Sequence, residues 1–189
     1  MLNAASSTST ISQDEIRSRN SIVDKRISSN NLRAVNVVGD GNCFFRSLSV
    51  CLSGGESDHN KLRKAISQYM IDSNAHLLAD SSSLAAKKAL YHLQSMGKDG
   101  VEVGEDVICA AASYLGRPVH VYSSLGHTWP CEYLPGGVTV LAPKPVRLAF
   151  YEPGHYMAVL GVAHCDDHTS PLASPSLVNY NTPVGNQLH

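Results

Sequence analysis

The order of the apolar patterns constrains the fold of this chain most, because helical spacing comes first and strand-like runs cluster near the end. Apolar residues recur at helical intervals in five segments, at about residues 14–33, 43–52, 58–70, 83–96 and 106–115. Runs rich in β-branched and aromatic residues follow at 118–122, 138–141, 146–150 and 155–162. This order predicts an α+β domain with a small central sheet, mostly antiparallel or mixed, flanked by helices.

The two ends of the chain lack these patterns. Residues 1–12 include six Ser or Thr, and residues 166–189 include three prolines among polar residues. Such segments bury too little apolar surface to order themselves. We therefore expect a flexible lead over 1–12, one folded domain over 13–165 and a flexible tail over 166–189. The full length of 189 residues suits a single domain.

Residues 40–47, which read Asp-Gly-Asn-Cys-Phe-Phe-Arg-Ser, carry the strongest chemical signal. Apolar residues at 44, 45, 48, 51 and 52 form one face of a helix, so Cys43 should lie in its first turn. The free N–H groups and positive dipole end of a helix favour a thiolate, which is the nucleophilic form of cysteine. Taken alone, however, a cysteine after such a turn is more often structural.

A histidine suited to act with this thiol appears more than 100 residues later. His155 lies between a Glu-Pro-Gly turn and an apolar run, at a predicted loop-to-strand junction. A nucleophilic cysteine and its histidine are commonly distant in sequence and meet only in the fold. The block at 40–47 and the His-Tyr pair at 155–156 together make a catalytic pair the stronger interpretation.

These two motifs resemble the ovarian-tumour (OTU) family of cysteine proteases, most of whose members cleave ubiquitin from proteins. Residues 40–47 match the family pattern at every position, and residues 104–122 look like its helix-then-strand element. The resemblance covers roughly residues 30–162. It implies a papain-related cysteine protease fold and a thiol-dependent deubiquitinase without a cofactor. The partners it implies are conjugates of ubiquitin or a ubiquitin-like protein.

The resemblance also implies roles for the residues of the turn and the late strand. Cys43 would be the nucleophile and His155 the general base and then the acid. Gly41 and Asn42 would shape the turn whose N–H groups, with that of Cys43, point at the oxyanion. Asp40 is the candidate third catalytic residue, acting on the histidine or bracing the oxyanion turn.

One position departs from the family pattern. Many members carry Asn or Asp two residues after the histidine, on the same strand face, where this chain has Met157. A thioether is too weak an acceptor to orient an imidazole. The third residue therefore comes from elsewhere, or the site is a dyad, or the activity is weakened.

The resemblance suggests candidate substrate contacts. A channel that admits only Gly-Gly needs close walls, so Tyr156 or Trp129 could line it, although Trp129 suits a core position equally well. Glu105, with its neighbours Glu102 and Asp106, could meet basic residues of a ubiquitin tail. A solvated, acidic helix start explains those carboxylates without any ligand, and is the simpler interpretation.

Other functions stay open. Met157 favours a catalytically weak ubiquitin-binding module, and nothing in the sequence excludes a protease of another substrate, such as a polyprotein. His164 with Asp166 mimics a histidine and its orienting carboxylate, but it precedes the polar tail. Residues 164–168 include potential zinc ligands, yet no second cluster completes a tetrahedral site. We therefore expect no metal.

Composition narrows the partners and the compartment. The net charge of −1 provides no basic surface for nucleic acid, and no apolar run reaches the ~20 residues of a membrane span. The five cysteines are an odd number without CxxC spacing, which favours a reducing compartment. We expect a cytoplasmic monomer, or one in the host cytoplasm if the origin is viral or bacterial. Cys51 and Cys109 should be core residues and Cys131 a loop residue.

Overall fold

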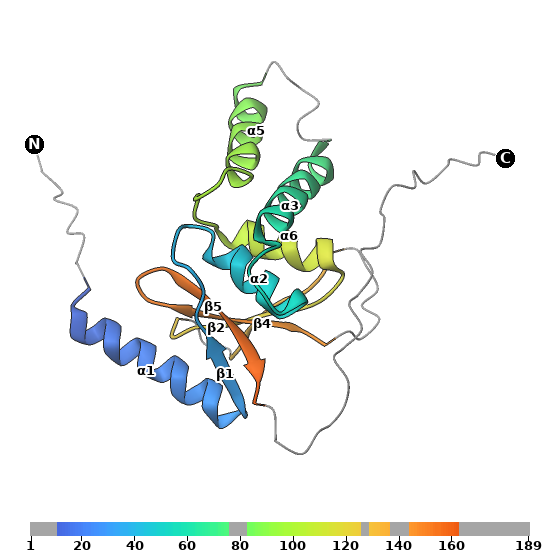
Figure 1. The fold of residues 1–189 in the computed structure, drawn as a ribbon. Helices are drawn as coiled ribbons and strands as arrows, with labels where there is room; N and C mark the ends of the chain where they lie inside the picture. Colours follow the sequence, from blue (N-terminus) through green and yellow to red (C-terminus); the bar gives the residue numbers. More distant parts are fainter. Residues whose placement is uncertain (1–10, 76–82, 126–128, 137–143, 163–189) are drawn as a thin grey trace, which may run out of the picture.

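The computed structural model describes residues 11–75, 83–125, 129–136 and 144–162 (Figure 1). The elements occur in the order α1 (Gln13–Ser29), β1 (Leu32–Val35), α2 (Cys43–Ser53), α3 (His59–Ser73), α5 (Leu84–Met96), α6 (Glu105–Leu115), β2 (Val119–Tyr122), β3 (Cys131–Tyr133), β4 (Val146–Tyr151) and β5 (His155–Gly161). The predicted α+β class is confirmed. Among the described elements, α2, α3, α5 and α6 all precede the clustered strands β2 to β5.

The strands form one sheet in the order β1-β5-β4-β2-β3. Only the β2–β4 pairing is parallel among the described strands, so the sheet is mostly antiparallel, as predicted. Strands β4 and β5 form a hairpin in which Tyr151 lies opposite His155. On the other side of β5, Val35 of β1 lies opposite Ala158.

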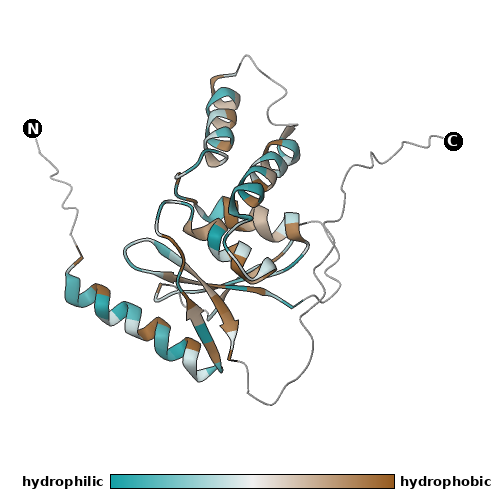
Figure 2. Cartoon of the chain, viewed as in Figure 1, coloured by the Kyte–Doolittle hydropathy of each residue, from teal (hydrophilic) through white to brown (hydrophobic). Residues whose placement is uncertain are grey.

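The sheet separates two layers of helices. Alternate strand residues face opposite sides, so Leu148 and Ala158 pack in clusters with α2, whereas Ala149 and Val159 pack with α1. Helices α2, α3 and α6 lie together on one side, and α1 lies apart from them (Figure 1). In the cartoon coloured by hydropathy, α1 is largely hydrophilic with a few hydrophobic residues (Figure 2). Its buried residues are Val23 and Ile27.

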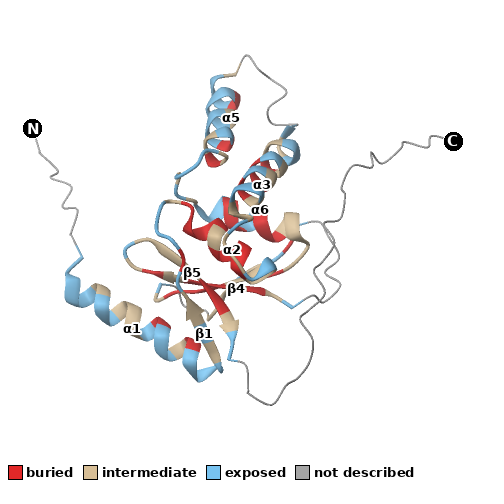
Figure 3. Ribbon diagram, in the orientation of Figure 1, coloured by how far each residue is buried: buried red, intermediate tan, exposed pale blue. Residues whose placement is uncertain are grey.

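Helix α2 lies at the centre of the domain and is buried over most of its length (Figure 3). Phe44, Phe45 and Leu48 are at most 1% exposed, and burying each such side chain contributes about 1.5–3 kcal/mol. Gly54 ends the helix in the left-handed region, at φ 81°, which glycine adopts at little cost. The burial of this helix therefore fixes the position of Cys43 within the core.

Some predicted boundaries were wrong at short edge elements. The segment at 14–33 contains one helix, α1, which ends at Ser29, and its last two residues already belong to β1, a strand that was not predicted. Ser12 caps the start of α1, where its Oγ accepts the Glu15 N–H at 3.2 Å. Cys131 begins strand β3 instead of lying in a loop. Edge strands of three or four residues carry too few side chains for a readable period.

Several predictions fall on other parts of the chain. The strand predicted at 138–141, the lead up to residue 10, His164 and the tail from 166 onward all lie outside the described residues. None of the described helices is long and apolar enough to cross a membrane.

Candidate active site

Cys43 is the first residue of α2 and is 7% exposed. Asn42 occupies the N-cap position, and its side chain makes no capping bond to the helix. The first N–H groups of a helix have no intrahelical acceptor. Together with the positive end of the helix dipole, they attract negative charge. The Tyr156 N–H also points at the Cys43 Sγ at 3.5 Å. The sulfur therefore lies between the start of α2 and strand β5.

His155 begins strand β5, as predicted, and its ring is bordered by the loop before α2. Its Nε2 lies 2.9 Å from Oδ1 of Asn36. A Cβ built on Gly39 would lie 3.6 Å from both Nδ1 and Cε1 of His155, so this backbone passes along the ring edge. With Nε2 donating to the amide, Nδ1 is the nitrogen left to exchange a proton with a thiol.

Asn36, the hydrogen-bond partner of the His155 ring, was not predicted from the sequence. It lies just after β1, 119 positions before the histidine. Because Val35 pairs with Ala158, the next position along β1 lies beside Met157 of β5. The acceptor that many relatives carry on the histidine's own strand thus comes here from the neighbouring chain segment. Nothing in the sequence distinguishes this Asn from other polar loop residues, because β1 itself was not predicted.

Met157 lies on the other side of the sheet from α2. It packs in the cluster beneath α1 that contains Val23, Ile27 and Val159. Its role is therefore packing, and its presence does not leave the histidine without a partner. The argument for a catalytically weak module, which rested on Met157, loses its basis.

Asp40 faces Arg46, whereas His155 is bonded by Asn36. The Asp40 Oδ2 lies 2.6 Å from Arg46 Nη2, and the Asp40 Oδ1 lies 3.0 Å from Arg46 Nε, so the two side chains make a two-point contact. The same Oδ1 accepts the Asn42 N–H at 3.1 Å. Bonding to Arg46 lowers the pKa of Asp40 well below its ordinary value, despite an opposing effect of desolvation. Of the two roles considered for Asp40, the geometry favours bracing the turn.

The bond from Asn42 also changes the expected oxyanion site. Its N–H is committed to Asp40 and is not aimed at a substrate oxygen. Cys43 occupies the first helical position, so its own N–H has no acceptor within the helix. We therefore place the Cys43 N–H at the oxyanion site and assign Asn42 to shaping the turn. Its Oδ1 accepts the Gly100 N–H at 3.2 Å.

Gly41 allows the turn to approach the loop before α6. Its φ is +75°, and a Cβ there would overlap the carbonyl oxygen of Gly100. The Gly41 carbonyl accepts a bond from Nη2 of Arg63 at 2.8 Å. The Arg63 side chain is 1% exposed and also donates to three carbonyls of the loop: Met96, Lys98 and Val101. Sequence reasoning missed Arg63, because a charged residue inside a helical stripe indicates a solvated position.

The predicted substrate residues divide into two groups. Tyr156 lies beside Cys43 and packs edge-on against Phe44, with ring centroids 5.3 Å apart. Burial raises its pKa to about 12, with smaller contributions from Cys43 and Glu105. Glu105 begins α6 and accepts a bond from the Tyr133 hydroxyl at 3.2 Å. Tyr156 therefore lies beside the thiol, and Glu105 lies near enough to the Tyr156 side chain to affect its pKa.

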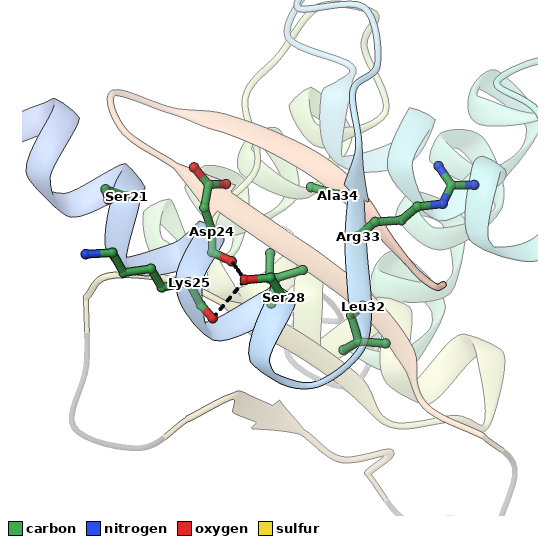
Figure 4. A pocket seen from close by; sticks show the side chains of 8 residues that line it. Ser21, Asp24, Lys25, Ser28, Leu32, Arg33 and Ala34 are labelled. Carbon is green, nitrogen blue, oxygen red and sulfur yellow. Dashed lines mark hydrogen bonds between the residues drawn. The ribbon is translucent and has the colours of Figure 1, made fainter. Parts of the chain in front are cut away.

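Trp129 lies on the other side of the sheet, which favours the core position over the place in the substrate channel that was considered equally with it. It packs on Tyr122, with centroids 5.2 Å apart, in the cluster beneath α1. The guanidinium carbon of Arg26 lies 4.3 Å above its ring. A hollow of about 340 Å³ between α1 and β1 is lined by Ser21, Asp24, Lys25, Ile27, Ser28, Leu32, Arg33 and Ala34, none of which is a proposed catalytic residue (Figure 4).

Cys51 and Cys109 are poor nucleophile candidates. The Cys51 thiol donates to the Arg147 carbonyl at 3.3 Å, and burial raises its pKa to about 11. Burial, then Glu105 and Asp106, raise the pKa of Cys109. Contrary to prediction, Cys109 is exposed, so it provides a natural control for surface reactivity.

Comparison with known proteins identifies the family. The profile of the OTU-like cysteine proteases matches residues 38–156, well over half of the chain. The chain belongs to the OTU family. Two OTU-domain deubiquitinating enzymes of Arabidopsis thaliana, numbered 6 and 7, are 26% and 24% identical over 64% and 68% of this chain. The chain covers only 23% and 32% of their lengths.

Solved structures show the same fold. The OTU domain of OTUD1 superposes with a TM-score of 0.62 at 21% identity, covering 79% of this chain and 99% of that domain. The viral OTU protease of Farallon virus gives 0.51 at 16% identity, over 71% of this chain and 86% of its own. The papain-related OTU fold implied by the sequence is therefore confirmed.

Proposed function

We propose that this protein is a cysteine-dependent deubiquitinase that uses Cys43 as nucleophile and His155 as acid–base residue. The observation that carries the proposal is the pair itself. Cys43 lies at the start of the buried helix α2, and His155 has its Nε2 2.9 Å from Oδ1 of Asn36. Membership of a family of cysteine proteases and likeness to two deubiquitinating enzymes support it.

In this mechanism His155 takes the proton of the Cys43 thiol, and the resulting thiolate attacks the carbonyl carbon of the last residue of the modifier. The electron pair of the C=O bond moves to oxygen, and the Cys43 N–H stabilises that oxyanion. When the C–O double bond re-forms, the C–N bond breaks, and His155 gives its proton to the leaving amine. A water molecule then attacks the thioester, with His155 taking its proton, and the C–S bond breaks to release the carboxylate.

Asn36 supports both steps as the residue that orients the imidazole. By accepting from Nε2, it keeps Nδ1 available for the proton transfers. Asp40 and Arg46 brace the turn before Cys43, and Arg63 ties this turn to the loop that precedes α6. The proposed substrate is the C-terminus of ubiquitin or a ubiquitin-like protein joined to a lysine amine. Tyr156 and Glu105 are the proposed contacts, since Tyr156 lies beside the thiol and Glu105 lies near the Tyr156 side chain.

A ubiquitin carrying a C-terminal electrophile tests the proposal directly. We expect one adduct, located on Cys43 by peptide mapping, which disappears in Cys43→Ala and persists in the matched variant Cys109→Ala. Cys109 is the suitable control because it is exposed and lies outside the site. An adduct on Cys109, or none on a folded protein, would contradict the proposal. An untagged electrophile that reacts with Cys43 when the ubiquitin probe does not would point to another substrate.

A further inference from the structure

The hairpin that carries His155 is tied to α1 by a reciprocal pair of hydrogen bonds. Nδ2 of Asn20 donates to the Glu152 carbonyl at 3.0 Å, and the Glu152 N–H donates to Oδ1 of Asn20 at 2.9 Å. One amide side chain thus satisfies both backbone groups of a loop residue, 132 positions away in sequence. Glu152 lies three residues before His155, in the turn between β4 and β5.

Two further contacts join α1 to the same hairpin. The Tyr151 hydroxyl donates to Oδ1 of Asp24 at 2.6 Å, and Arg19 Nη1 lies 3.5 Å from the Glu152 carboxylate. Tyr151 is the residue directly opposite His155 in the β4–β5 ladder. Within the turn, the Gly154 N–H donates to the Tyr151 carbonyl at 3.0 Å. Helix α1 therefore contacts consecutive residues of the hairpin that ends at the histidine.

Helix α1 is itself fixed firmly enough to act as a support. Val23 and Ile27, at most 2% exposed, pack against the sheet. Figure 4 shows that the Ser28 hydroxyl bonds to carbonyls of its own helix, at Asp24 and Lys25, while the Asp24 side chain points away from Ser28. The Asp24 carboxylate is thus available to Tyr151.

We propose that α1 is a positioning element for the catalytic histidine, and that Asn20 is its principal positioning residue. The proposal rests on the proposed role of His155. Helix α1 and Asn20 precede the segment matched by the family profile, which begins at residue 38. A turn joined to the sheet only at its two ends can move relative to α2, and Cys43 lies on α2. The Asn20 bonds fix the Glu152 backbone, and so set where the His155 ring meets the thiol.

Variants of α1 test this proposal. Because a misplacement of about 1 Å can cost about 100-fold in rate, we expect Asn20→Ala to lower kcat on a fluorogenic ubiquitin substrate by about 10- to 100-fold. KM should stay unchanged, since the substrate surface is untouched. Alkylation of Cys43 by iodoacetamide at pH 7 should slow as well, because the thiol loses its aligned base. Asn20→Asp keeps the acceptor for the Glu152 N–H and should recover part of both rates.

Arg17→Ala is the matched control. Arg17 lies exposed on the same helix and pairs with Asp14 at 3.6 Å, so its replacement leaves Asn20, Asp24 and the buried face of α1 in place. Both kcat and the alkylation rate of this variant should stay at the wild-type values. If Asn20→Ala equals wild type in kcat and alkylation, or if Arg17→Ala reduces both as much, the proposal is overturned. If Asn20→Ala does not fold, Asn20→Asp and Tyr151→Phe carry the same comparison.

The alkylation measurement separates this proposal from the proposed function. Iodoacetamide needs no ubiquitin, so it reports the thiol and its histidine even if the true substrate differs. A wild-type protein that ignores ubiquitin while Asn20→Ala still slows alkylation would reject the substrate and support the positioning role. Full ubiquitin hydrolysis by a folded Asn20→Ala would do the opposite.

Discussion

The two halves of the catalytic pair are built in different ways. The cysteine half is largely local: Asp40 bonds to Arg46 six residues later, and Asn42 bonds back to Asp40. The histidine half is assembled from distant segments, with Asn36 on the ring and Asn20 on the hairpin, 119 and 132 residues away. A nucleophile at a helix start can therefore be recognised from a short motif, whereas the partners of its histidine depend on which strands become neighbours.

The largest effect should come from removing the histidine. We expect His155→Ala to lower turnover by at least about 1,000-fold, since it removes both the base and the acid. The matched control is His120→Ala, because His120 lies on β2 with Nε2 2.8 Å from the Glu132 carboxylate and outside the site. Steady-state hydrolysis of a fluorogenic ubiquitin substrate measures both. A His155 variant with substantial turnover would mean that the histidine half has been misidentified.

The second largest effect on turnover should come from replacing Asn36, the distant residue that contacts the His155 ring. We expect Asn36→Ala to lower kcat by about 10- to 100-fold through misorientation of the imidazole. Asn36→Asp, which keeps an acceptor, should retain more activity. The melting temperature should change little, since Asn36 is exposed. Equal activity of Asn36→Ala and wild type would show that Cys43 and His155 work as a dyad.

A smaller and pH-dependent effect is expected on the cysteine side. Because Arg46 lowers the folded-state pKa of Asp40, the contact contributes stability above the ordinary carboxyl pKa of about 3.9. That contribution is lost as the pH falls below this value toward the lowered folded pKa. The melting temperature of Asp40→Asn should thus lie below wild type at neutral pH, with the gap closing below about pH 4.

Turnover of Asp40→Asn should fall by about tenfold, as the turn before Cys43 loosens. Asp58→Asn is the control, since Asp58 forms an exposed ion pair with Lys61 at 3.1 Å. A pH-independent gap in melting temperature would show that Asp40 acts through something other than its charge on Arg46.

The smallest effect on catalysis is expected at Met157. Met157→Asn places an amide in the apolar cluster beneath α1, which should cost about 1–3 kcal/mol of stability. Turnover per folded molecule should not change, because Asn36 already accepts from the histidine. Thermal melts and kcat together check this. A gain in kcat would indicate that position 157 can reach the ring and that the α1 side of β5 has been misjudged.

The sequence alone determined the class of fold, and it singled out Cys43 and His155 as the candidate catalytic pair. The apolar periodicity of a helix or strand depends on that element alone, so it predicts the fold class without knowledge of the packing. The block at 40–47 places Cys43 at a helix start by local geometry. The role of Gly41 in shaping the turn was also predictable, because few residues other than glycine adopt a positive φ. Local rules were sufficient wherever the interacting residues lie within one or two turns of each other.

Tertiary structure decided what surrounds these residues. The pairing of β1 with β5 brings Asn36 to His155, and the packing of α1 brings Asn20 to the hairpin. The alternation of strand faces assigns Met157 and Trp129 to the cluster under α1, away from the thiol. From the sequence alone, Arg63 is expected at the surface. In the structure its guanidinium donates to four carbonyls, three of them at residues 96–101 and the fourth at Gly41. These contacts join residues far apart along the chain, so no local period or propensity encodes them.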